Sequence, residues 1–163
     1  DLVRSRGLGD VYKRQVSTNH YPFKDFKPHG LVEFYQREHT LLTTATGPFN
    51  EEIIEAHSFM QQDYINKLTT AYGQWYELVE FENSCMATPG ALEKLMVYFV
   101  ELRRKGIAPA KTALVIKEGL EGGSLLTETY CNLYKRAGMV MNVFKSKTAA
   151  LNWLAEEPVA ELA

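Results

Sequence analysis

Apolar side chains recur at two different spacings along this chain, and the spacing changes from segment to segment. Short runs rich in β-branched and aromatic residues predict strands, and longer segments with apolar residues three or four positions apart predict helices. The predicted strands cover residues 31–38, 40–46, 75–82, 112–116 and 139–144. The predicted helices follow Asn50, Thr88, Ser124 and Ser146.

Each predicted helix begins at a residue whose side chain can accept hydrogen bonds from the free N–H groups of the first turn. Asn50 precedes Glu51, whose charge suits the positive end of the helix dipole. Thr88 precedes Pro89, and proline is favoured at the first helical position. We expect Ser124 to act in the same way for the third helix.

The order of these elements is ββαβαβαβα. Strands that alternate with helices require mainly parallel pairing, whereas the hairpin formed by the first two strands adds one antiparallel pair. The sequence therefore predicts an α/β fold with a mixed, mainly parallel five-stranded sheet flanked by four helices.

The length of 163 residues fits one domain, which we place at residues 30–157. Residues 1–29 show no hydrophobic period, so we predict a disordered leader there and a tail over residues 158–163. Within residues 1–15 the stretch DVYKRQ resembles translated sequencing-adapter read-through, so we interpret residues 1–15 as non-native. A disordered basic tail is the alternative interpretation of that segment.

Composition narrows the class of protein. Hydrophobic residues make up 45% of the chain, enough for a sizeable core, and the formal net charge is −2. This charge gives no attraction to nucleic acid, and no apolar run approaches the roughly 18–20 residues of a membrane helix. The two cysteines, Cys85 and Cys131, form no CxxC motif. We expect a cytoplasmic protein without stable membrane insertion or nucleic-acid binding.

Three segments carry a family resemblance: TATGPFNEE, WYELVEFENSCMATPGALEKL and TAALNWL. From Gly30 to Glu157 the chain resembles the STAS-domain, stage II sporulation protein AA-like family. It is most similar to the short bacterial proteins labelled STAS/SEC14-like. The resemblance implies a mixed sheet flanked by helices. It also favours a non-catalytic regulatory or protein-interaction module with a protein partner.

In the better-understood anti-sigma-factor antagonists of this family, a serine in a D-S-x-G-type turn at the second helix start is phosphorylated. Thr88 matches that serine and Gly90 the glycine, while Ala87 stands in place of the aspartate and Pro89 follows the hydroxyl. The resemblance thus implies an interaction and phospho-acceptor loop made of Asn83, Ser84, Cys85, Thr88 and Gly90. For Thr88, the simpler interpretation is a helix N-cap, which the missing aspartate favours.

Other chemistry-bearing residues have simple structural interpretations. We interpret His57, on the apolar stripe of the first helix, as a core histidine with one hydrogen bond. Cys85 precedes a helix start and could be reactive, but a packed thiol is favoured. Strand carboxylates, Glu77 among them, are expected to be exposed. Without a catalytic triad, cofactor fingerprint or helical metal spacing, we expect no enzyme activity, cofactor or metal.

Aromatic residues make up 12% of the chain, and they leave a second function open. Tyr64, Tyr98, Tyr130 and Tyr134 are among the rings that fill the layers of the core or else wall an apolar pocket. The SEC14-like side of the resemblance implies the same alternative. In that case the protein is a carrier of a small apolar or lipid-like ligand.

Overall fold

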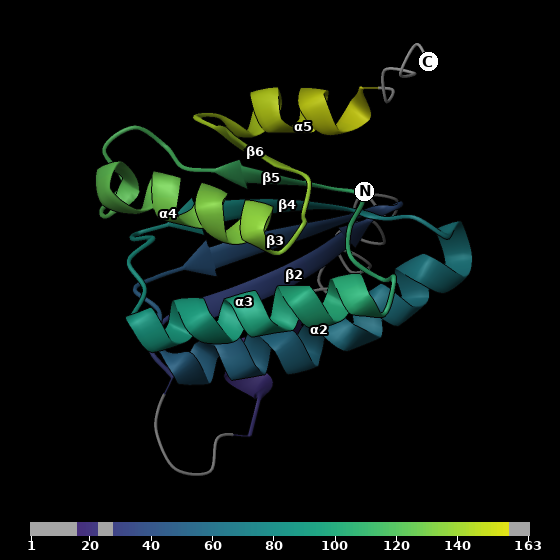
Figure 1. Ribbon diagram of the computed structural model, residues 1–163, viewed down its shortest axis with the longest axis horizontal. Helices are drawn as coiled ribbons and strands as arrows, with labels where there is room; N and C mark the ends of the chain where they lie inside the picture. The colour runs from purple at the N-terminus through teal and green to yellow at the C-terminus, as the bar shows by residue number, and fades with distance from the viewer. Residues whose placement is uncertain (1–15, 23–27, 157–163) are drawn as a thin grey trace, which may run out of the picture.

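A computed structural model describes residues 16–22 and 28–156 (Figure 1). The strands are β1 (Val16–Ser17), β2 (Leu31–Arg37), β3 (Thr40–Thr46), β4 (Tyr76–Glu82), β5 (Lys111–Val115) and β6 (Met141–Phe144). The helices are the short 3-10 helix η1 (Thr18–His20), α2 (Glu51–Tyr72), α3 (Pro89–Arg104), α4 (Gly123–Arg136) and α5 (Lys147–Ala155).

The six strands lie in the sheet in the order in which they occur in the chain. The first three pair antiparallel, and β3 to β6 pair parallel. The predicted α/β fold with a mixed, mainly parallel sheet is confirmed, with six strands instead of five. Since β3 to β6 advance in one direction, this part of the sheet lacks the reversal of strand order where open α/β sheets usually bind ligands.

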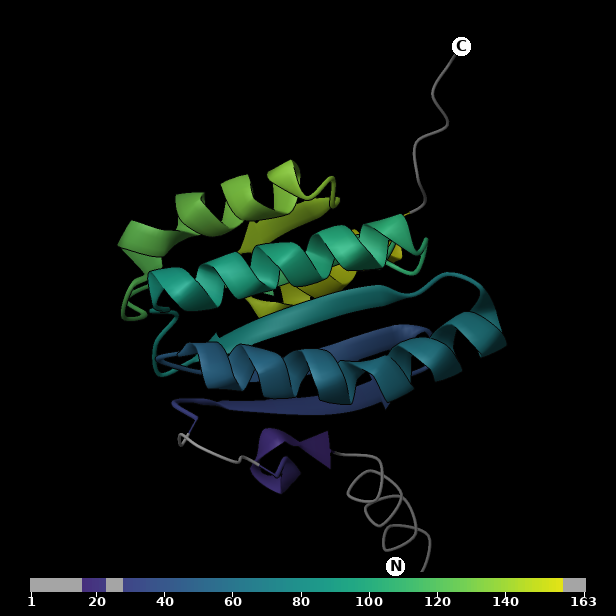
Figure 2. The same ribbon diagram turned by 60° about the horizontal axis from the view of Figure 1, so that its bottom comes forward.

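Crossovers between parallel strands are right-handed. When the strand order also advances in one direction, the connecting helices all lie on the same face of the sheet. Helices α2, α3 and α4 accordingly lie side by side across one face (Figure 2). Helix α5 covers the other face and buries Ala150 and Leu154 against Leu78, Ala113 and Val115 (Figure 1). The larger core lies between the sheet and the three helices.

The predicted caps of α2, α3 and α5 are confirmed. Asn50 Oδ1 accepts from the backbone N of Ile53 at 3.2 Å. The hydroxyls of Thr88 and Ser146 accept in the same way from residues 91 and 149, at 3.1 and 3.2 Å. These contacts satisfy N–H groups that the first helical turn leaves free.

The predicted cap of α4 is wrong. The helix begins at Gly123, one residue before Ser124, and its N-cap is Gly122 with a left-handed φ of 82°. A Cβ atom at Gly122 would lie 2.8 Å from Met86 Sδ, so glycine meets both the backbone and the packing requirement. Ser124 instead occupies the second helical position.

The predicted leader is also wrong over residues 16–22. Val16 and Ser17 pair with Phe34 and Glu33 of β2, which makes β1 the edge strand. Thr18 is buried, and its Oγ1 accepts a hydrogen bond from the backbone N of Val32 at 2.9 Å. A two-residue strand is too short to produce a hydrophobic period. Residues 1–15 and 158–163 lie outside the described residues.

Candidate functional site

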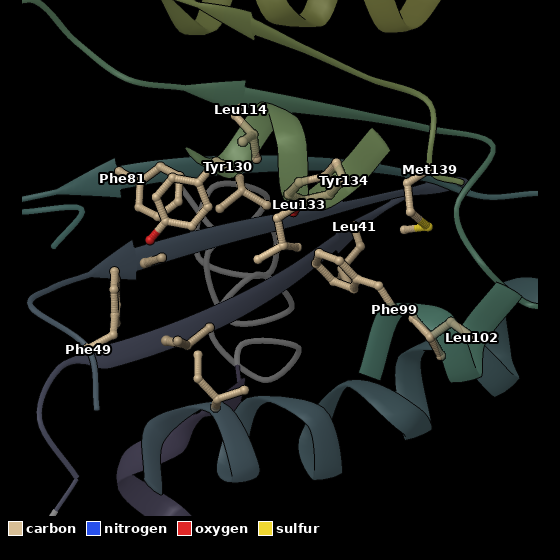
Figure 3. Close-up of a cluster of buried hydrophobic side chains, with 14 of the residues drawn as sticks. Leu41, Phe49, Phe81, Phe99, Leu102, Leu114, Tyr130, Leu133, Tyr134 and Met139 are labelled. Atoms are coloured by element: carbon tan, nitrogen blue, oxygen red, sulfur yellow. The ribbon is translucent and has the colours of Figure 1, made fainter. Parts of the chain in front are cut away.

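A cavity of about 60 Å³ lies between the sheet and helices α2, α3 and α4. The sheet contributes Val32, Thr43, Ala45, Glu77, Val79 and Phe81 to its walls, and the rest come from Phe49, Ile54, His57, Leu95, Phe99, Tyr130 and Tyr134. In Figure 3, Phe49, Phe81 and Tyr130 lie at one end of the buried cluster and Phe99 at the other. The walls are mainly apolar with a few polar groups, the usual composition of a small-molecule site.

Glu77 places a carboxyl group in this apolar wall. It alternates with Val79 and Phe81 along β4, so all three side chains point to the face that α2, α3 and α4 cover. Its exposed fraction is only 4%, and burial raises its pKa from 4.5 to about 7. The raised pKa follows because the charged form loses hydration, and a hydrogen bond from the Gln61 amide offsets part of that loss.

All three covering helices send a polar side chain toward Glu77. From α2, Gln61 Nε2 donates to Glu77 Oε2 at 2.5 Å. From α3, the Tyr98 hydroxyl donates to Gln61 Oε1 at 2.6 Å and accepts from Gln62 Nε2 at 3.2 Å. From α4, Tyr134 lies near enough that the charge of Glu77 helps burial to raise the phenol pKa. Glu77 is therefore the meeting point of β4 and the helix layer.

Two further polar groups in the cavity wall lack hydrogen-bond partners. The Oγ1 of Thr43 and the Nδ1 of His57 are both buried without a partner among the described residues. His57 as a residue is half-buried, and its ring packs against Phe34 and Tyr98. Burial lowers the pKa of His57 from 6.5 to about 4, so the ring is neutral at physiological pH. The prediction that His57 is satisfied by a hydrogen bond is therefore wrong for its Nδ1 atom.

Unpartnered buried polar atoms are uncommon in folded proteins. Thr43, His57 and Glu77 come from β3, α2 and β4, yet their side chains line one small cavity. A ligand that fills this space contacts a hydroxyl, a neutral imidazole nitrogen and a carboxyl group among aromatic rings. The arrangement can orient a small molecule through hydrogen bonds while apolar contacts hold its body.

The loop predicted from the family resemblance has a buried part and an exposed part. Ser84 and Cys85 are fully buried, and their backbones form hydrogen bonds with Gly47 and Glu121. Asn83 is exposed with a left-handed φ of 64°, and its Nδ2 donates to the carbonyl of Gly47 at 2.8 Å. The loop thus ties together the segments that follow β3, β4 and β5, as structural loops do.

Thr88 is the exposed hydroxyl of this loop, and it caps α3. The carboxylate of Glu51 lies against the first turn of α3, since a Cβ atom at Gly90 would stand 1.8 Å from Glu51 Oε1. A phosphate on Thr88 would therefore share the helix N-terminus with an existing negative charge. Burial raises the pKa of the Cys85 thiol, which agrees with a packed rather than a reactive cysteine.

Two residues of the cavity wall form hydrogen bonds with the predicted loop. The Tyr130 hydroxyl donates to the carbonyl of Cys85 at 2.8 Å. Phe49 N donates to the carbonyl of Met86 at 2.8 Å, and Thr88 N donates to the carbonyl of Phe49 at 3.1 Å. Since the rings of Phe49 and Tyr130 line the cavity, the loop holds one end of it in place.

Sequence reasoning missed Glu77, Thr43 and Gln61 as site residues, and the expected exposure of Glu77 is wrong. The face of β4 on which Glu77 lies could have been predicted from the sequence. Side chains alternate between the two faces of a strand, so Glu77 lies on the same face as the apolar Val79 and Phe81. Gln61 likewise flanks the apolar stripe of α2. Thr43 carries no comparable signal, since threonine is common in strands on either face.

Comparisons with known protein families, with curated proteins and with solved structures gave no match to this chain. Among the described residues, no group of three or more His, Cys, Asp or Glu side chains has the arrangement of a metal site. Within the same residues, none of the helices has both the length and the apolar character that crossing a membrane requires.

Proposed function

We propose that the protein is a non-catalytic binding module that takes up a small, largely apolar ligand between the sheet and α2, α3 and α4. The observation that supports this proposal best is the cavity itself, whose mainly apolar wall includes Thr43 and His57, each with a buried polar atom that lacks a partner among the described residues. A bound molecule with one polar group would satisfy them, because buried donors and acceptors are normally paired.

The size of the cavity limits the ligand. A water needs on the order of 10–15 Å³ of such volume, so about 60 Å³ accommodates roughly four to six non-hydrogen atoms. Of the alternatives that the sequence left open, we therefore propose the small apolar ligand rather than a lipid chain. Ile54 lines both the cavity and an exposed groove between α2 and α3, so we place the entrance there.

The proposal is tested with two small neutral probes, xenon and propan-1-ol. Each should shift the ¹³C methyl resonances of Val79 and Leu95, which line the cavity. Ala45→Leu, which adds three carbon atoms to the buried wall, should abolish the shifts. Ala71→Leu adds the same atoms on the exposed surface of α2 and should leave them unchanged.

Absence of any shift in the wild-type protein would contradict the proposal. So would unchanged binding of the probes by a folded Ala45→Leu variant. Ala45→Val adds fewer atoms and should weaken binding by an intermediate amount, which keeps the test informative if the leucine variant unfolds.

A regulatory module with a protein partner is the second candidate function, and it corresponds to the family resemblance. One observation favours it: Thr88 is an exposed residue at the N-terminus of α3. The candidate predicts that Thr88→Glu changes the set of bound partners and that Thr88→Ala does not reproduce the change. Identical partners for both variants and the wild type would exclude it.

A further inference from the structure

The polar atoms that Glu77, Thr43 and His57 add to the cavity wall can all accept hydrogen bonds. The Glu77 carboxylate accepts only, and Thr43 Oγ1 is able to accept. His57 Nδ1 also accepts when the neutral ring carries its proton on Nε2. Among the described residues, the cavity wall contains no lysine or arginine. Nothing in the wall therefore neutralises a charge on Glu77.

The groups that face Glu77 are uncharged near neutral pH. They are the Gln61 amide from α2, the Tyr98 hydroxyl beyond it from α3, and the Tyr134 phenol from α4, with the neutral His57 ring in the same wall. Burial raises the phenol pKa of both tyrosines further, so they remain protonated. An ionised Glu77 is thus a buried carboxylate without a cation, which is a costly arrangement.

Aromatic rings complete the surroundings. Phe81 and Tyr130 have ring centroids 5.2 Å apart, and Phe99 and Tyr134 have centroids 4.6 Å apart. All four rings line the cavity together with Phe49. The faces of aromatic rings carry negative partial charge, so rings around a small space favour a positively charged group inside it.

We infer that the ligand of this cavity is a short-chain organic ammonium ion, whose ammonium group pairs with the Glu77 carboxylate and whose alkyl chain lies among the aromatic rings. Because the cavity is so small, a ligand that fills it reaches every wall. The three N–H donors of a primary ammonium group match Glu77, Thr43 and His57 as acceptors. This inference rests on the proposed function of the cavity as a ligand site.

Ligands of other charge fit the wall less well. A carboxylate ligand would meet Glu77 as a like charge, with no described cation to offset the repulsion. A neutral alcohol would supply one donor and leave an ionised Glu77 unpaired. An ammonium ion supplies the charge that the wall lacks, and it favours ionisation of Glu77 when it binds.

The experiment compares three probes of four non-hydrogen atoms each: propylammonium, propan-1-ol and acetate. Dissociation constants are measured from the methyl shifts of Val79 and Leu95 between pH 5 and 8. We expect propylammonium to bind at least about tenfold more tightly than propan-1-ol at pH 8, and acetate not to bind. Below pH 7 its affinity should fall up to about tenfold per pH unit, as Glu77 becomes protonated.

Glu77→Gln keeps the shape of the side chain and should abolish the preference for propylammonium while preserving the binding of propan-1-ol. Equal affinities, tighter binding of propan-1-ol or acetate, or a preference that survives Glu77→Gln would overturn the inference. The wild-type pH dependence tests it independently if that variant does not fold. Binding of propan-1-ol alone overturns the ammonium ligand but supports the proposed function, whereas no binding of any probe overturns both.

Discussion

Gln61 on α2 donates a hydrogen bond to the carboxyl group of Glu77 on β4, and neither side chain is more than 4% exposed. The carbonyl oxygen of the same Gln61 amide accepts from Tyr98 on α3. One amide therefore joins two helices to the centre of the sheet. Such buried networks stabilise a fold when every member is satisfied and are costly when one is removed.

We expect Gln61→Leu to lower the free energy of unfolding by about 2–4 kcal/mol at pH 8, because it leaves the Glu77 carboxylate buried without its donor. The double variant Gln61→Leu/Glu77→Leu should recover most of this loss, since no charge then remains to be desolvated. Urea unfolding of the wild type, of Gln61→Leu, of Glu77→Leu and of the double variant measures both effects. Additive losses in the double variant would show that the two side chains do not depend on each other.

Glu77 and His57 should affect stability in opposite directions as pH changes. The folded-state pKa of Glu77 is raised, so its contribution to the free energy of unfolding is greatest below pH 4.5 and is lost as pH rises to about 7. The folded-state pKa of His57 is lowered, so its contribution is complete above pH 6.5 and is lost as pH falls to about 4.

Relative to wild type, Glu77→Gln should therefore gain up to about 3 kcal/mol between pH 4.5 and 7. His57→Gln should gain stability relative to wild type as pH falls from 6.5 to 4, by a smaller amount because the residue is only half-buried. Urea midpoints across pH measure both differences. Thr43→Val is the non-titrating control in the same cavity. If neither variant's difference in stability from wild type changed with pH, the burial of Glu77 and His57 would be contradicted.

Three buried threonines provide a matched series. The hydroxyls of Thr43 and Thr112 lack partners among the described residues, whereas that of Thr18 accepts from the backbone N of Val32. We expect Thr43→Val and Thr112→Val to be neutral or to stabilise by up to about 1 kcal/mol, and Thr18→Val to destabilise by about 1–3 kcal/mol. Thermal unfolding measures all three. A destabilised Thr43→Val would reveal a partner for that hydroxyl.

Alanine substitution tests whether Thr88 caps its helix while Ser124 does not. Thr88→Ala removes the hydroxyl that accepts from the backbone N of Ala91, so it should lower the free energy of unfolding by about 1 kcal/mol. Thr88→Ser should restore most of the loss. Ser124→Ala should have little effect, because Gly122 rather than Ser124 is the N-cap of α4. Equal losses at both sites would disagree with the observed helix start.

Local patterns predicted the fold because each element carries its own signals. Asn50, Thr88 and Ser146 mark helix starts in the sequence, and each caps its helix in the structure. The short edge strand β1 was missed, since Val16 and Ser17 are held by pairing with β2 and not by a pattern of their own. Its stability depends on contacts between residues far apart in the chain.

The candidate site was predictable only in part for the same reason. Alternation along β4 places Glu77 on the same face as Val79 and Phe81. Its burial, however, depends on α2, α3 and α4, which meet over it. Gln61 and Tyr98 are 37 positions apart, and no spacing rule relates them. A cavity also reflects what packing leaves unfilled, which a pattern of apolar positions does not describe.

The most direct test of this account is the titration of the Glu77 carboxyl carbon, followed by ¹³C NMR in the ligand-free protein. A carboxyl group buried in an apolar wall and hydrogen-bonded by Gln61 should titrate with a pKa of about 7. Titration near the ordinary value of 4.5 would mean that water reaches Glu77 freely. In that case the buried cavity wall around Glu77, and both proposals built on it, would be wrong.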